Sequence, residues 1–180
     1  MKRFICAMVI TALEFFAVPV FARVNQAVQP LFFEHLQSAL TSGQSPPSIH
    51  AGAVNEVSLA DLAWAVDNLK SDPVPLVIEF YSSNTADCLL TPNSQENECD
   101  LQDDAEAAAA ANYPGRVRFL RIDVSKYPIL LNGPDVRALP SHIFIAAYSD
   151  TTHYTANKAM GYFDTSAIES LVKDSLRIDP

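Results

Sequence analysis

Few cysteines, glycines and basic residues occur in this sequence, and each shortage excludes a class of function. The 180 residues include three Cys and five Gly, and 12 basic residues face 21 acidic ones, for a formal net charge of −9. So acidic a chain is a poor candidate for binding nucleic acid or an anionic membrane surface, which are themselves negatively charged. The sequence contains no phosphate-cradling glycine loop, no nucleophile elbow and no heptad array. The four His are scattered without metal-ligand spacing toward the Cys, so we expect no metal and no cofactor.

Residues 1–22 have the features of a signal peptide. Two basic residues follow the first Met, an apolar stretch covers 4–13, and residues 20–22 place small side chains where a signal peptidase reads them. We therefore predict cleavage after about Ala22 and export to the periplasm, or secretion. An uncleaved N-terminal anchor is the alternative. It is the one membrane contact we expect, because no other stretch of the sequence is long and apolar enough to span a bilayer.

A helix and a linker are predicted between the signal peptide and the main domain, over residues 23–49. Apolar residues recur at three- and four-residue spacing over 24–42, which is typical of an amphipathic helix, and Gly43 is a suitable C-cap. The Pro and Ser residues of 45–48 then form a stiff linker. The helix either packs on the main domain, which we favour because single amphipathic helices usually serve the core, or docks on a partner or a second copy.

Residues 50–180 have the pattern of one α/β domain. The expected elements, in order, are strand 53–57, helix 58–70, strand 76–81, a helix from near Asp100 to Tyr113, strand 117–124, strand 138–145, a hairpin strand at 153–156 and helix 165–176. Ser58 is the predicted N-cap of the first helix, supported by Asp61, and 166–169 has the form of a capping box. A strand–helix–strand unit followed by a hairpin and a helix predicts a small mixed sheet with helices on both faces.

Acidic residues gather in the first turns of the helix predicted from Asp100. They lack the alternating ligands and the central Gly that a calcium-binding loop requires. We therefore interpret them as a solvated helix start. The residues concerned are Asp100, Asp103, Asp104 and Glu106.

The segment from Pro75 to Cys88 is the part of the chain around which the rest is organised. Its apolar residues 76–81 predict a buried strand, and this strand contains one carboxylate, Glu79, which needs a partner or a function in apolar surroundings. Small polar residues follow and end at Cys88. We expect Cys88 to begin a helix, where free N–H groups and the helix dipole stabilise a thiolate.

From about Val54 to Leu176 this order of elements resembles the thioredoxin superfamily. The residues that carry the likeness are Glu79 at the buried acid of the family's central strand, 85–88 at the place of the Cys-x-x-Cys motif, 139–141 at the cis-proline loop, and Gly161 before the last helix. The resemblance implies a thioredoxin-like fold, here with an N-terminal helical extension. It also implies that Pro140 is cis and lies beside a groove that holds an extended substrate strand.

The likeness to thioredoxins ends at the chemical site. Thr85 stands where the family has its attacking Cys, and Cys88 stands where it has the resolving Cys. A Thr hydroxyl cannot replace a thiolate in disulfide exchange, which requires a sulfur nucleophile. We therefore expect no standard reductase activity. The alternative is an atypical thiol–disulfide oxidoreductase that uses Cys88 and Cys99, with Glu79 as its proton relay.

Cleavage of the signal peptide would remove Cys6 and leave Cys88 and Cys99. An oxidising compartment favours a disulfide between these two residues. On one unbroken helix their spacing corresponds to a rise of about 16 Å, whereas a disulfide requires roughly 4–7 Å between Cα atoms. The chain must therefore turn between them, and Pro92-Asn93-Ser94 supplies the turn. We predict a loop, 89–99, pinned by a Cys88–Cys99 disulfide that is either a structural staple or a relocated redox pair.

A minor alternative comes from a second resemblance. Thr85-x-x-Cys88 is similar to the motif around the peroxide-reacting Cys of peroxiredoxins, with Cys99 as the resolving thiol, although Tyr81 stands where that family has Pro. The sequence as a whole favours a protein partner in an envelope assembly, bound through the groove beside Pro140 or through helix 24–42. His142, two residues after this Pro, is interpreted as structural or solvated.

Overall fold

The computed structural model describes residues 30–40, 46–91, 96–132, 136–146 and 155–180. The predicted signal peptide, Gly43, the turn at 92–94 and His153 lie outside these ranges. None of the helices within the ranges is long and apolar enough to cross a membrane. In chain order the elements are α1 (Pro30–Ala39), β1 (Val54–Glu56), α2 (Leu59–Asn68), β2 (Leu76–Tyr81), the short 3-10 helix η1 (Thr85–Asp87), α3 (Glu98–Ala111), β3 (Arg118–Asp123), the 3-10 helix η2 (Pro128–Asn132), β4 (Ser141–Ala146), β5 (Thr155–Met160) and α4 (Thr165–Leu176).

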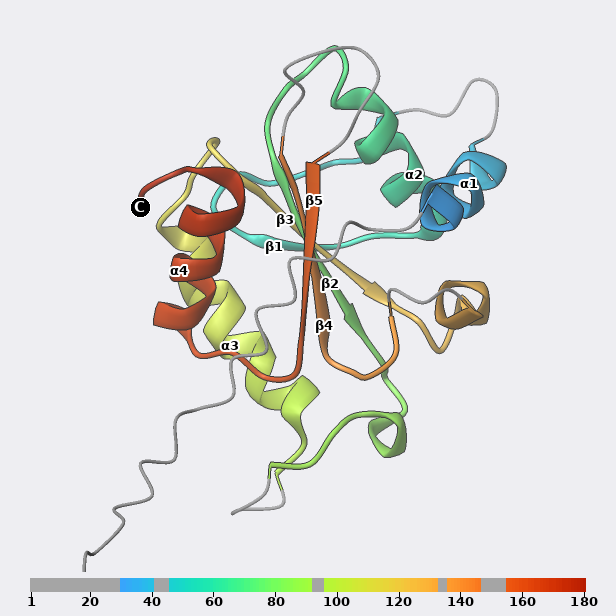
Figure 1. Cartoon of the computed structure of the whole chain (residues 1–180), viewed down its shortest axis with the longest axis vertical. Helices are drawn as coiled ribbons and strands as arrows, with labels where there is room; N and C mark the ends of the chain where they lie inside the picture. Colours follow the sequence, from blue (N-terminus) through green and yellow to red (C-terminus); the bar gives the residue numbers. More distant parts are fainter. Residues whose placement is uncertain (1–29, 41–45, 92–95, 133–135, 147–154) are drawn as a thin grey trace, which may run out of the picture.

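The strands form one mixed sheet, as expected from the sequence, and their order is β1-β3-β2-β4-β5. β1, β3 and β2 run parallel, while β4 pairs antiparallel with both β2 and β5. Helices α1 and α2 cover one face of this sheet, and α3 and α4 cover the other (Figure 1). β2 is therefore central in the sheet and covered on both sides, which is why its apolar run is buried along almost its whole length.

Alternation along β2 divides the interior into two cores. Leu76, Ile78 and Phe80 point to the side of α1 and α2, and Val77 points to the side of α3 and α4. Glu79 follows Val77 on the second side by the same period of two. The sequence places a carboxylate on a face that is otherwise filled by apolar residues, and this placement dictates the electrostatics of the α3 side.

Helix α1 packs on α2 within the described part of the extension. Leu36 is buried in the same core as the α2 side chains, and Ala39 packs against that core. The helix ends at Ala39 rather than at 42, and Leu40 is already exposed. This arrangement agrees with the interpretation of the segment as a helix that serves the core of the domain.

The helix caps agree with the sequence in one case and differ in another. Ser58 is the N-cap of α2, as predicted, and it forms a capping box with Asp61. At α4 the N-cap is Asp164 rather than Ser166, because the Asp164 carboxylate accepts a hydrogen bond from the Ala167 N–H at 2.8 Å. Ser166 donates its hydroxyl to the same carboxylate, so the capping box predicted for 166–169 is wrong.

Replacement of the α2 cap tests this reading of the local structure. We expect Ser58→Ala to lower the free energy of unfolding by about 1 kcal/mol, because it removes the acceptor for the Asp61 N–H. Urea denaturation measures the loss. Ser58→Thr keeps a capping hydroxyl and is expected to retain most of the stability, so an equal loss in both variants would contradict the role of the cap.

Candidate functional site

The loop after β2 is held in place by polar contacts to β3 and within itself. Ser83 donates its N–H to the Asp123 carboxylate at 3.1 Å, and Ser82 donates its hydroxyl to Asp87 at 3.0 Å. Burial raises the pKa of Asp123, but hydrogen bonds from Ser125 and Ser83 lower it further than burial raises it, so this carboxylate stays ionised. The loop therefore delivers Thr85 and Cys88 to a defined position at the end of the sheet.

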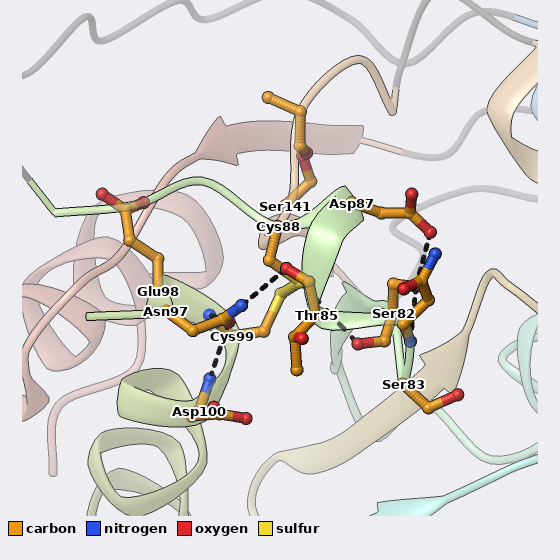
Figure 2. Close-up of a disulfide and its surroundings, with 12 residues drawn as sticks. Ser82, Ser83, Thr85, Asp87, Cys88, Asn97, Glu98, Cys99, Asp100 and Ser141 are labelled. Atoms are coloured by element: carbon orange, nitrogen blue, oxygen red, sulfur yellow. Dashed lines mark hydrogen bonds between the residues drawn. A yellow bond between two sulfur atoms is a disulfide. The ribbon is translucent and has the colours of Figure 1, made fainter. Parts of the chain in front are cut away.

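Cys88 and Cys99 form a disulfide, with their Cα atoms 6.0 Å apart, which confirms the predicted pairing. Beyond the disulfide the two limbs of the loop pair with each other. An antiparallel bridge joins Leu90 to Asn97, and the Glu98 N–H donates to the Leu89 carbonyl at 2.9 Å. The disulfide and this short ladder hold the loop against the start of α3 (Figure 2).

The two sulfur atoms occupy the reverse of the expected environments. Cys88 follows η1 in an extended conformation and does not begin a helix, so that expectation is wrong. Cys99 lies in the first turn of α3 instead, and its N–H donates to the capping side chain of Asn97 at 2.9 Å. Asn97 also donates to the Thr85 carbonyl at 2.7 Å, which ties η1 to this helix start (Figure 2). On reduction, Cys99 is the thiol that the helix dipole would make more acidic.

The disulfide is shielded from solvent. Cys88 is 7% exposed and Cys99 is 3% exposed, and both pack in the core on the α1 and α2 side, together with Phe80 and Leu139. Thr85 is exposed. Thiol–disulfide exchange requires a thiolate to reach a sulfur atom, so burial of both sulfurs opposes exchange in this conformation.

The peptide bond between Leu139 and Pro140 is cis, as the resemblance implied. The loop that contains this bond lies between two other segments: the Leu89 N–H donates to the Leu139 carbonyl, and the Gly161 N–H donates to the Pro140 carbonyl, each at 2.8 Å. A groove of about 450 Å³ lies beside it. Its described lining residues are Asp87, Leu131, Val136, Arg137, Ala138 and Leu139.

A second group of polar residues is buried between the sheet and α3. Glu79 of β2 lies opposite His142 of β4 and beside Arg121 of β3 in the sheet register. Glu106 reaches the same place from α3. Glu79, Glu106 and His142 are fully buried, so the interpretation of Glu106 as part of a solvated helix start is wrong, as is a solvated His142.

The protonation of this group follows from its burial. Burial raises the pKa of Glu106 well above its ordinary value, and the charge of Glu79 raises it further. Burial also raises the pKa of Glu79, while a hydrogen bond with Glu106 and the charge of Arg121 lower it in part. Burial therefore favours the protonated form of Glu106, whose hydroxyl can donate to the Glu79 carboxylate. Burial lowers the pKa of His142 to about 3, which leaves its ring neutral near pH 7.

The structure thus separates residues that the sequence treated as one site. Thr85, Cys88, Cys99 and the Pro140 loop meet at the end of the sheet. Glu79 lies with Glu106 and His142 on the α3 face of the sheet, whereas the cysteines pack in the core on the opposite face. The sequence gives no signal for the burial of Glu106, because the run of Ala at 107–111 does not distinguish one face of the helix from the other.

Solved thioredoxins have similar structures. Chloroplastic thioredoxin z matches with a TM-score of 0.50 and 19% identity over 68% of this chain and 93% of its own. Thioredoxin NaTrxh from Nicotiana alata matches with a TM-score of 0.52 and 15% identity, over 76% of this chain and 99% of its own. A mutant thioredoxin from Halobacterium salinarum matches with a TM-score of 0.50 and 16% identity, over 74% of this chain and 100% of its own. Neither a protein-family model nor a curated protein matches the sequence. The chain has a thioredoxin-like fold.

The buried carboxyls predict an unusual dependence of stability on pH. Because the folded-state pKa of Glu106 is raised, its protonated form contributes stability that is complete below the unfolded value and is lost as the pH rises through the folded value. His142 acts in the opposite sense. The stability that its neutral form contributes is complete above about pH 6.5, the ordinary pKa of His, and is lost as the pH falls toward its folded-state pKa of about 3. Glu106→Gln removes the first effect and leaves that of His142 in place.

We therefore expect Glu106→Gln to gain stability relative to wild type as the pH rises from about 5 to 8, by at most about 1.4 kcal/mol per pH unit for one proton. Urea denaturation at several pH values in a chelating buffer measures this difference. Asp104→Asn, at an exposed acid on the same helix, is the control and is expected to show no such trend. A difference between Glu106→Gln and wild type that stays constant with pH would contradict the assignment of the proton.

Proposed function

We propose that this chain is an exported protein whose thioredoxin-like domain binds a partner protein of the cell envelope, and that it does not act as a standard disulfide reductase. The observation that carries the proposal is the burial of both sulfur atoms of the Cys88–Cys99 disulfide. A reductase must present at least one sulfur to its substrate. Here the neighbouring exposed position is Thr85, whose hydroxyl cannot attack a disulfide.

The groove beside Pro140 is the proposed binding surface. Leu131 at its edge is 42% exposed, and Leu90, next to the residue that pairs with the cis-proline loop, is 54% exposed. Exposed apolar side chains around a groove favour an extended segment of a partner protein. Asp87 and Arg137 line the same groove and supply one charge of each sign, which would orient that segment.

An oxidoreductase that uses Cys88 and Cys99 is the second candidate, and one observation favours it. Cys99 lies in the first turn of α3, where a thiolate is stabilised after reduction. The shielding of the disulfide would then have to be relieved by movement of the loop. The peroxidase alternative also requires a free Cys88 thiol, which the disulfide removes in this state.

Measurement of the disulfide separates these two candidates. For the purified exported form we expect a reduction potential well below about −300 mV and no insulin reduction, as for a structural disulfide. Cys88→Ser, which cannot form the bond, supplies the baseline for both assays. A potential near that of exchange enzymes, together with insulin reduction above that baseline, would favour the oxidoreductase, and two alkylatable thiols in the exported form would contradict the disulfide itself.

The groove is tested with a matched pair of variants on η2. Leu131→Asp places a charge in the groove, whereas Ile129→Asp places one at an exposed apolar residue of the same short helix that does not line it. We expect the partner that co-purifies with the wild-type protein from envelope extracts to be retained by Ile129→Asp. Its recovery should fall at least tenfold with Leu131→Asp. Equal recovery with both variants would exclude this groove as the binding surface.

A further inference from the structure

We propose that Glu79, Glu106 and His142 form a binding site for a divalent transition-metal ion of the zinc class, in the layer between the sheet and α3. The site is separate from the groove and does not depend on the proposed function. It also reverses the expectation of no metal, which rested on spacing along the sequence. The three residues come from β2, α3 and β4, so no local motif announces them.

The positions of the ligand atoms support the site. One oxygen from each carboxyl and one ring nitrogen of His142 lie within 4.8 Å of one another. Three atoms so placed have a common centre no more than about 2.8 Å from each, whereas zinc lies roughly 2.0–2.2 Å from oxygen and nitrogen ligands. Side-chain movements of less than about 1 Å would close that difference. The backbone positions are already set by the sheet register and by the packing of α3.

Apart from the contact between the two carboxyls and the 3.6 Å ion pair of Glu79 with Arg121, the ligand atoms make no polar contacts within the described ranges. Within the described ranges, no N–H group donates to the Glu79 or Glu106 carboxylates, and neither ring nitrogen of His142 has a hydrogen-bond partner. The ring is instead held by aromatic packing, with the Phe144 and Phe163 rings at 6.3 and 5.6 Å. Buried polar atoms are normally satisfied, so a fully buried imidazole without a partner, facing two carboxyls, points to a ligand.

Arg121 leaves room for the ion. Its Nη1 binds Asp103 at 2.6 Å, its guanidinium lies over the Tyr81 ring at 3.8 Å, and its Nε is 3.6 Å from Glu79, beyond a normal hydrogen bond. Arg121 is therefore shared between Asp103 and Glu79, and it compensates one of the three negative charges of Asp103, Glu79 and Glu106. Two negative charges remain, which a divalent ion would balance inside the protein. Without the ion, one carboxyl must keep a proton.

The ligand set selects the class of metal. An imidazole with two carboxylates suits zinc and its neighbours in the first transition row, including cobalt. Calcium and magnesium prefer sites made wholly of oxygen atoms, and copper(I) prefers sulfur. His142 is neutral at physiological pH, as a metal ligand must be.

The experiment uses the full exported chain with its disulfide oxidised, so that neither cysteine is free to bind metal. Cobalt(II) is titrated in and followed by its visible absorption, and zinc(II) is added to displace it. We expect one ion per chain. Glu106→Gln and His142→Asn should each weaken binding at least tenfold, whereas Asp104→Asn, an exposed acid on the same helix, should not.

The proposal fails if the wild-type protein binds no stoichiometric cobalt or zinc at micromolar metal, in which case the three residues share only a proton. It also fails if Asp104→Asn weakens binding as much as Glu106→Gln does, because the ion would then lie on the surface. If either ligand variant does not fold, as judged by circular dichroism, Glu106→Asp serves instead. It keeps the charge but withdraws the oxygen, and an unchanged cobalt spectrum with this variant would overturn the assignment.

Discussion

The burial of β2 on both faces is the constraint on which the rest of this structure depends. Its central place between β3 and β4 makes every side chain along it part of one core or the other. The Glu79 side chain is therefore shielded from water, and groups on the neighbouring elements must compensate its negative charge. The end of the same strand fixes where the loop to η1 begins, so the disulfide and the buried carboxyls both follow from this one strand.

Two kinds of site with different chemistry result from this constraint. At the end of the sheet, the disulfide joins the loop to the start of α3, and both of its cysteines are buried. Under α3, Glu79, Glu106 and His142 form a polar cluster in an apolar layer. Burial has opposite consequences in these places. It protects a covalent bond in the first, whereas in the second it makes ionisation so unfavourable that a proton or a cation is required.

The disulfide and the cis form of Pro140 could both be predicted from the sequence, for different reasons. Two cysteines with a turn between them have one way to pair, and Pro140 followed from the resemblance of its loop to a known fold. The environments of the sulfurs could not be predicted in this way. Cys88 was assigned to a helix start because it follows a strand, but the chain makes one 3-10 turn and extends, so the long helix begins at Glu98.

The sequence by itself determined the order of elements, the burial of β2 and the pairing of Cys88 with Cys99, because periodicity, apolar runs and cysteine count are local or compositional properties. Only the tertiary structure decided that Glu106 is buried against Glu79 and His142 and that the disulfide is shielded. The physical reason is that both depend on the face α3 presents to the sheet. Helix packing sets that face. From the sequence alone, the acidic first turns of α3 are predicted to be exposed to solvent, and only the packing of the helix on the sheet shows that Glu106 is buried.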